Sequence, residues 1–139
     1  MKLKVILDGN AKMPTKAHEA DAGFDLYAPR SFTVLCNAAT TIDTGVHIEI
    51  PKGYVGFLKS KSGLNVKHGI TGEGVVDAGY TGSIVAKLYN NGHEPIRFEK
   101  GQKIIQIVFL PIPDVELEQV SSFEETERGN NGFGSSGKF

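Results

Sequence analysis

Apolar residues recur along this chain in short runs whose patterns are those of β-strands. Residues 46–50 and 115–118 alternate apolar with polar side chains, which is the period of a strand with one buried face. β-Branched and aromatic residues, which favour strands, dominate five further runs: 2–7, 32–36, 55–59, 83–89 and 104–110. Glycine, proline and asparagine separate these runs and mark turns. The pattern therefore predicts many short strands.

The only helix that the pattern predicts is short, at residues 62–68. Gly69 is placed to end it, because glycine readily adopts the left-handed conformation that often follows a helix. No window has a sustained 3.6-residue period. Many short strands at regular spacing are typical of an antiparallel sandwich or barrel. The predicted fold class is all-β, and a chain of 139 residues fits a single domain.

Composition and charge exclude several classes of function. A net charge of −1 lacks the basic footprint of a protein that binds a nucleic-acid polymer. Cys36 is the one cysteine, which excludes an internal disulfide and a four-cysteine zinc site. The four histidines, which are interpreted as surface or hydrogen-bonded residues and not metal ligands, are His18, His47, His68 and His93. No signal peptide or membrane span is recognisable, so we expect a cytoplasmic protein.

Residues 128–137 combine four glycines with one cation, Arg128, one aromatic ring, Phe133, and two hydroxyls, Ser135 and Ser136. The glycines permit close approach to a ligand. The other side chains suit an aromatic base at one end and anionic oxygens at the other. A tail of this kind is, by itself, more typical of a disordered terminus. The spacing of three of its glycines matches a dinucleotide fingerprint, but no helix follows, which excludes that motif.

Asp77 lies in the second informative segment, residues 74–82. It follows two β-branched residues, Val75 and Val76, and precedes a glycine turn, which predicts a carboxylate at the rim of a hairpin. A carboxylate there can orient a water molecule and accept its proton as a general base. The alternative is a turn-forming aspartate that bonds its own backbone. Tyr80 could either pack on the hairpin or form a flat wall against a sugar.

Three more polar groups stand out near predicted strands. Residues 59–62 place two lysines and two serines just before the helix, which suits either phosphate binding or an ordinary serine N-cap. Asp25 could steer a metal-bound water, pair with a basic residue, or be a charge at the end of a strand. Gln106 lies within an apolar run, so it must either tie down a loop or reach a ligand oxygen.

These segments, in this order, resemble the five motifs of the trimeric deoxyuridine triphosphatases (dUTP diphosphatases). The motifs correspond to residues 22–26, 61–64, 74–82, 101–106 and 128–137, so the resemblance spans nearly the whole chain. It implies a jelly-roll-like antiparallel β-sandwich or barrel over residues 1–120, with a flexible glycine-rich arm at 121–139. It also implies a homotrimer with active sites at the subunit interfaces.

The resemblance implies hydrolysis of dUTP to dUMP and pyrophosphate with Mg²⁺, which lowers dUTP and supplies dUMP for dTMP synthesis. Asp77 would activate the water that attacks the α-phosphorus. Asp25 would hold either a neighbouring basic group or the water shell of a metal that is bound mainly by the substrate phosphates. Phe133 of the arm would stack on the uracil.

The implied substrate contacts divide by the part of the nucleotide. Ser62, Gly63 and Gln106 would contact phosphates, while Arg128, Ser135 and Ser136 would close over the γ-phosphate. The backbone of residues 71–76 would read the uracil edge, and Tyr80 would pack beneath the deoxyribose. The full set of expected contacts is Lys61, Ser62, Gly63, Thr71, Gly74, Val75, Val76, Tyr80, Val85, Lys87, Gln106, Arg128, Phe133, Gly134, Ser135 and Ser136.

The chain departs from the family pattern at three positions. Lys61 stands where the second motif usually has arginine, which keeps the charge but loses the planar, two-pronged donor. Thr71 stands where many members have asparagine, and Glu73 is charged where small residues are common. Recognition of the base would therefore rest more on backbone groups.

Two rival functions remain open at this point. The related dCTP deaminases use a glutamate as a proton shuttle, and Glu73 is the one acid in the base-reading segment ahead of Asp77. Release of ammonia would indicate a deaminase, and release of pyrophosphate a triphosphatase. The second rival is a nucleotide-gated regulatory protein, in which phosphates order the tail and a partner protein reads that state.

Overall fold

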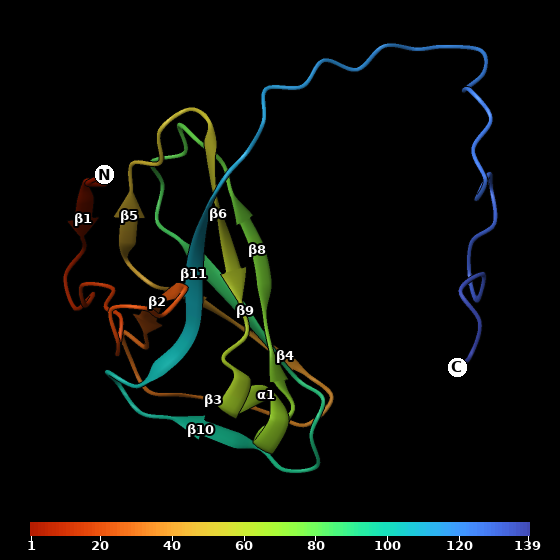
Figure 1. Cartoon of the computed structure of the whole chain (residues 1–139). Coiled ribbons are helices and arrows are strands. Elements are labelled where there is room, and N and C mark those ends of the chain that lie inside the picture. Colours follow the sequence, from red (N-terminus) through yellow and green to blue (C-terminus); the bar gives the residue numbers. More distant parts are fainter.

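The computed structural model describes residues 1–139 and consists mostly of β-strands (Figure 1). A single helix, α1 (Ser62–His68), interrupts them. The strands are β1 (Val5–Leu7), β2 (Gly23–Tyr27), β3 (Phe32–Val34), β4 (Ala39–Asp43), β5 (Val46–Ile48), β6 (Tyr54–Lys59), β7 (Ile70–Thr71), β8 (Glu73–Val76), β9 (Val85–Asn90), β10 (Ile96–Phe98) and β11 (Lys103–Pro111).

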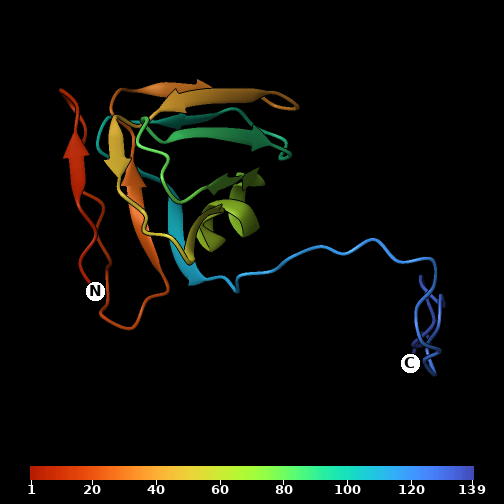
Figure 2. The same cartoon turned by 90° about the horizontal axis from the view of Figure 1, so that it is seen from above.

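The strands form four antiparallel sheets that enclose one core (Figure 2). The largest has the order β2-β11-β6-β8, and the next has the order β4-β9-β7. Two pairs, β1-β5 and β3-β10, complete the body. Neighbours in these sheets are mostly distant in sequence, as in a jelly roll. The predicted fold class, all-β with one short helix, is confirmed.

Strand periodicity accounts for the core. Along β9 the side chains of Ala86, Leu88 and Asn90 point inward and those between them point outward, which is the two-residue alternation of a strand with one buried face. The core cluster holds 18 buried hydrophobic residues. Its largest fully buried side chains include Phe98, Leu26, Ile42, Ile104, Ile105 and Ile107. Burial of these apolar surfaces supplies the main driving force for folding.

Most sequence predictions of the elements are confirmed, but one strand is wrong. Residues 115–118 alternate in polarity and yet form no strand, and the side chains of Val115 and Leu117 are exposed. An alternating segment forms a strand only where the edge of a sheet supplies partners for its backbone hydrogen bonds. No strand of the chain pairs with this segment. The predicted runs also omit β2, β4, β7, β8 and β10, which are short or contain polar residues and glycine.

The C-terminal segment leaves the body after β11 and extends away from it (Figure 1). Its last backbone hydrogen bond to the body runs from the Ile112 amide to the Gly53 carbonyl, at 2.9 Å. Every residue from 112 to 139 is exposed. A boundary between core and arm at residue 120 stays a prediction. No helix of the chain is long and apolar enough to cross a membrane.

We expect Gly69→Ala to destabilise the fold more than Gly53→Ala. Both glycines have positive φ, at 69° and 88°, so alanine costs about 1–2 kcal/mol of backbone strain at either position. At Gly69, a Cβ atom would also lie 2.6 Å from the Gly92 nitrogen, whereas nothing lies within 4 Å at Gly53. Urea unfolding of the two variants measures the difference. An equal loss of unfolding free energy in both would contradict the close packing of Gly69 against the Gly92 backbone.

Candidate active site

Three adjacent strands bring together polar groups that are far apart in the sequence. In the central strand β11, Gln106 lies opposite Asp25 of β2 on one side and Lys59 of β6 on the other. The Gln106 side-chain amide donates to the Ser60 carbonyl at 3.1 Å, so it ties down the connection between β6 and α1. Gly23 leaves room for this side chain, because a Cβ atom there would lie 2.3 Å from the Gln106 Oε1 atom.

Asp25 is the buried centre of this region, with 5% of its surface exposed. Its Oδ1 atom pairs with the Lys61 ammonium, and its Oδ2 atom pairs with the Lys103 ammonium at 2.7 Å. Burial alone would raise the pKa of Asp25. The hydrogen bonds and positive charges of Lys103 and Lys61 outweigh it and lower the pKa below the ordinary value. The carboxylate therefore stays ionised, and it pairs with basic groups as one of the sequence hypotheses expected.

Lys103 is a residue that the sequence analysis missed. It lies three positions before Gln106, so strict strand alternation would put the two side chains on opposite faces. The register between β11 and β2 shifts by one residue between Lys103 and Ile105, which is a β-bulge. Lys103 consequently lies opposite Tyr27, on the same face as Asp25. A lysine at the start of an otherwise apolar run was the one signal in the sequence.

A pocket of about 380 Å³ opens beside this ion-paired cluster. Its lining consists of Ala17, Asp21, Ala22, Gly23, Asp25, Lys61, Ser62, Gly63, Lys103 and Gln106. Two glycines and two alanines in the lining leave this side of the pocket without large side chains. The N-cap of α1 is Lys61, and no side chain caps the helix, so the serine N-cap expected as an alternative is not formed. The structure thus gathers five of the expected residues here: Asp25, Lys61, Ser62, Gly63 and Gln106.

A second, more open pocket of about 580 Å³ adjoins the first and shares Lys61, Gly63 and Lys103 with it. Lys12, Lys67 and His68 also line it, and no carboxylate does. The Lys12 ammonium lies 4.0 Å from the centre of the Tyr27 ring. Basic side chains therefore surround the outer side of the ion-paired cluster.

Asp77 lies on a different part of the surface, directly after β8. Its backbone carbonyl accepts a hydrogen bond from the Tyr80 amide at 3.2 Å, which closes a turn, and Gly79 in that turn has a φ of 83°. Its carboxylate is exposed and bonds no backbone group, so the turn-stabilising alternative is not seen.

The predicted hairpin around Asp77 is wrong as well. Strand β8 pairs with β6, whereas β9 pairs with β4 and β7, so residues 77–84 cross from one sheet to the other.

The other expected base and sugar contacts lie near this crossing. Val75 and Val85 expose their side chains on β8 and β9, and the Tyr80 ring is 47% exposed. Lys87 also faces outward on β9. Gly74 lies on β8 and Thr71 on β7, where the Asn91 amide donates to the Thr71 hydroxyl at 3.3 Å. The Val76 side chain is in the core, so only its backbone can meet a ligand.

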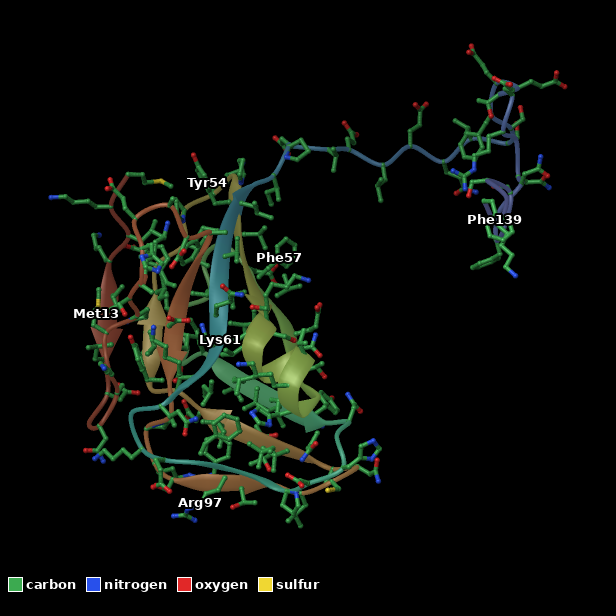
Figure 3. All side chains as sticks on the ribbon, turned by 60° about the horizontal axis from the view of Figure 1, so that its bottom comes forward. Met13, Tyr54, Phe57, Lys61, Arg97 and Phe139 are labelled. Carbon is green, nitrogen blue, oxygen red and sulfur yellow. The ribbon has the colours of Figure 1, made fainter.

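The third group of expected residues lies in the extended C-terminal segment, far from the other two. Figure 3 shows the labelled Lys61 in the body and Phe139 at the remote end of the segment. The Phe133 ring is fully exposed, as are Gly134, Ser135 and Ser136. Arg128 contacts only its own segment, through a hydrogen bond to the Asn131 carbonyl at 3.0 Å. One copy of the chain therefore does not bring the three groups together.

The chain does not form a resident metal centre. No three His, Cys, Asp or Glu side chains gather in a way that could hold a metal ion. Both oxygens of Asp25 are already paired with lysines, so a hydrated cation would have to displace one of them. Any metal at this site would need most of its ligands from elsewhere.

Comparisons with known proteins agree on one family. The family model described as dUTPase matches residues 9–137. A deoxyuridine 5'-triphosphate nucleotidohydrolase of Clostridium tetani is 39% identical over 141 residues, which cover 99% of this chain and 97% of the relative. The deoxyuridine 5'-triphosphate nucleotidohydrolase of Kluyveromyces lactis is 40% identical, and the match covers 98% of this chain and 94% of the relative.

Solved structures of phage enzymes have the same fold. The dUTPase of Staphylococcus bacteriophage 80alpha with dUPNHPP superposes with a TM-score of 0.92 at 34% identity and covers 99% of both chains. A mutant dUTPase from phage phi11 of S. aureus, with a coordinated structural Mg(II) ion, has a TM-score of 0.82 at 30% identity. It covers 90% of this chain and all of its own.

We expect Asp25→Asn to lower the free energy of unfolding by about 2 kcal/mol at pH 7, because two partly exposed lysine ammonium groups lose their hydrogen bonds to a buried carboxylate. Since the pKa of Asp25 is lowered, its stabilisation is fully present above the ordinary carboxyl pKa and is lost as the pH falls through the lowered value. Urea unfolding measures both effects.

The matched control is Glu73→Gln, which removes an exposed partner of Lys59 and should cost no more than about 1 kcal/mol. Equal losses in the two variants would show that the Asp25 cluster is no more than a surface ion pair.

Proposed function

Because the chain belongs to the dUTPase family, it is a dUTP diphosphatase, and we propose that its reaction occurs in a composite site. Two surfaces of the body and the C-terminal arm complete this site together. The reaction adds water to the α-phosphorus of dUTP and breaks the bond to the bridging oxygen, so that dUMP and pyrophosphate are released. The enzyme must bind a triphosphate, activate a water molecule and reject nucleotides that carry another nucleobase.

The observation that carries the proposal is the cluster of Asp25, Lys61 and Lys103 beneath the small-walled pocket. Each ammonium has three N–H donors and uses one on Asp25, so donors remain for phosphate oxygens. The lysines are held in place before the substrate arrives, which reduces the entropic cost of binding. Ser62, Gly63 and Gln106 border the same pocket and complete the phosphate contacts. The adjoining lysines favour the approach of an anion.

Asp77 is the proposed general base. Its carboxylate is exposed and not committed to a backbone bond, so it can orient a water and accept its proton as the water attacks the α-phosphorus. The negative charge that builds up on the phosphates is stabilised by the lysine donors of the pocket. Asp77 does not line the phosphate pocket, which supports a site shared between copies of the chain.

The surface around Asp77 is proposed to hold the base and the sugar. The backbone of residues 71–76, including Gly74 and Val75, offers hydrogen-bonding groups for the uracil edge. The Tyr80 hydroxyl donates to the Ser83 carbonyl at 2.9 Å, which fixes the ring as a wall against the deoxyribose. Val85 and Lys87 extend this surface along β9.

The arm would complete the site on a neighbouring copy in a homotrimer. From residue 112 to residue 133 an extended chain spans roughly 70 Å, since each residue contributes about 3.3 Å. This reach lets Phe133 stack on the uracil while Arg128, Gly134, Ser135 and Ser136 cover the phosphates. The exposure of these groups in the single chain supports the arrangement, because each is free to bind.

Magnesium is proposed to enter with the nucleotide. The residues present do not make a metal centre, whereas the phosphates of dUTP supply oxygen ligands of the kind that Mg²⁺ prefers. Asp25 then acts on the lysines and has no direct contact with the ion.

The rival functions receive less support. Glu73, the proton shuttle that a deaminase would need, is paired with Lys59 at 3.0 Å. The relatives are nucleotidohydrolases and not deaminases. A purely regulatory protein would not need the exposed Asp77 carboxylate as a general base. For the phage 80alpha enzyme a role in controlling the transfer of virulence genes is described, which is a property of that protein.

We expect Asp77→Asn to lower kcat about 10²–10⁴-fold, the usual contribution of a general base, because the amide cannot accept the proton. Binding of dUPNHPP should stay within a few-fold of the wild type, since the shape of the side chain is kept. Pyrophosphate release and calorimetry measure the two quantities. Asp114→Asn, in the exposed segment beyond the body, is the control and should behave as wild type. Turnover of Asp77→Asn at the wild-type rate would exclude this residue as the base.

Deletion of residues 129–139 should leave the oligomer folded but lower kcat/KM strongly. The segment is exposed and contributes no side chain to the core, so its loss removes only the closing contacts. Analytical ultracentrifugation gives the oligomeric state and pyrophosphate release gives the kinetics. Deletion of residues 138–139 alone, which are not proposed to touch substrate, serves as the control. Dissociation of the oligomer in the longer deletion would show that the arm is structural.

A further inference from the structure

His47 lies outside all five sequence segments and yet contacts one of them. It is in β5, where it lies opposite Ile6 of β1. The His47 Nδ1 atom is 2.8 Å from the Thr81 carbonyl, and the His47 Nε2 atom is 2.8 Å from the Asp8 carboxylate. Thr81 follows Tyr80 directly in the crossing between β8 and β9. The imidazole thus connects the N-terminal strand pair to the segment that carries Asp77 and Tyr80.

The chemistry of the two partners fixes the protonation state that this geometry requires. A backbone carbonyl and a carboxylate are both acceptors and have no proton to donate. Both ring nitrogens of His47 must therefore carry hydrogen, which is the imidazolium form. A neutral imidazole has one N–H and can satisfy only one of the two partners.

Asp8 is itself held in place by backbone contacts. Its amide donates to the Gly45 carbonyl at 2.8 Å, and its carbonyl accepts from the Ala11 amide at 2.7 Å. The register of β1 with β5 places Asp8, which follows β1 directly, near His47. The backbone of Asp8 is therefore held beside His47, and its carboxylate reaches the imidazolium from there.

The other connections of this crossing to the body lie toward its two ends. At the β9 end, the Ile84 carbonyl accepts hydrogen bonds from the Thr44 amide at 3.0 Å and from the Thr44 hydroxyl at 2.6 Å. The Ser83 hydroxyl pairs with the Asp43 carboxylate, and the Ile84 amide donates to the Val46 carbonyl at 2.8 Å. Both contacts lie at the β9 end of the crossing. On the Asp77 side, the Gly79 amide makes a longer bond of 3.3 Å to the Ile50 carbonyl. The bond from His47 to Thr81 is thus a short connection between the body and the middle of the crossing.

We propose that His47, anchored by Asp8, is a positioning residue for hydrolysis: as imidazolium it fixes the Thr81 carbonyl and thereby holds Tyr80 and Asp77 in their places against the nucleotide. The inference depends on the proposed roles of Asp77 and Tyr80. It adds to them a group that is not proposed to contact the substrate or the attacking water and that acts through the backbone.

This role makes catalysis depend on pH in a defined direction. The hydrogen bond to Asp8, and next the bond to Thr81, raise the pKa of His47 above its ordinary value of about 6.5. The charged groups that face it are Asp8 and Asp43, both negative, which act in the same sense. The positioning is fully present below the ordinary pKa, and it is lost as the pH rises through the raised pKa and one N–H disappears.

The test combines kinetics with a direct titration of the ring. The values of kcat and KM for dUTP are measured from pH 5.5 to 9 in the full-length protein, and the pKa of His47 is measured by NMR. We expect kcat/KM of the wild type to fall on the alkaline side with the same pKa that NMR reports for His47. In His47→Gln this alkaline limb should vanish, and kcat/KM at pH 6 should be about tenfold lower, as for one lost hydrogen bond.

Asp8→Asn keeps the shape of the anchor but removes its charge, so the alkaline limb should move to lower pH together with the NMR pKa. A merely structural contact would not shift the profile in this way. This variant also carries the test if His47→Gln does not fold. His93→Gln is the control, because His93 is exposed and outside the network, and its profile should match the wild type.

An alkaline limb that persists in His47→Gln, or that stays in place in Asp8→Asn, would overturn the positioning role. The proposed function would survive that result, since it fails only if Asp77→Asn retains turnover. The two failures are therefore distinguishable.

Discussion

The buried pairing of Asp25 with two lysines is the interaction on which the rest of this structure depends. It joins β2 to the start of β11 through Lys103, and to the connection between β6 and α1 through Lys61. A carboxylate with so little exposed surface would be costly if it were unpaired. With two cations around it the charge is compensated, and the unused ammonium donors face a pocket with small walls. The same contact thus holds three elements together and places two basic groups beside a pocket.

The remaining chemistry lies where the body has little to hold it. Asp77 and Tyr80 belong to a crossing between two sheets, and the residues of the arm belong to no sheet at all. This division suits an enzyme that binds a long, flexible substrate. In the proposed site, the phosphate end of the nucleotide meets the ion-paired cluster, and the base end meets the crossing and the arm. Ordering the arm costs conformational entropy, which the contacts of the bound nucleotide must offset.

The proposed role of His47 places a positioning residue outside the binding site. An imidazolium between two acceptors is a stronger constraint than a neutral side chain would be, because hydrogen bonds that involve charged groups are stronger than neutral ones. The network connects β1 and β5 to the crossing that carries the proposed general base, Asp77. Such a coupling is not visible in a sequence motif, since its members are distant in sequence and one of them acts through a backbone carbonyl.

The sequence by itself determined the all-β class, the alternating strand β5, the β-branched and aromatic run that contains β9, and the helix ended by Gly69. These features depend on local preferences and on burial of alternate residues, which are written in neighbouring positions. The sequence motifs also named Asp25, Lys61, Ser62, Gly63 and Gln106, which line one pocket; their role in binding phosphate stays a prediction. Only the tertiary structure decided that Lys103 shares a face with Asp25, because a one-residue bulge reverses the alternation there. Tertiary pairing also decided that residues 115–118 form no strand and that no hairpin surrounds Asp77, since a strand exists only where another strand lies beside it.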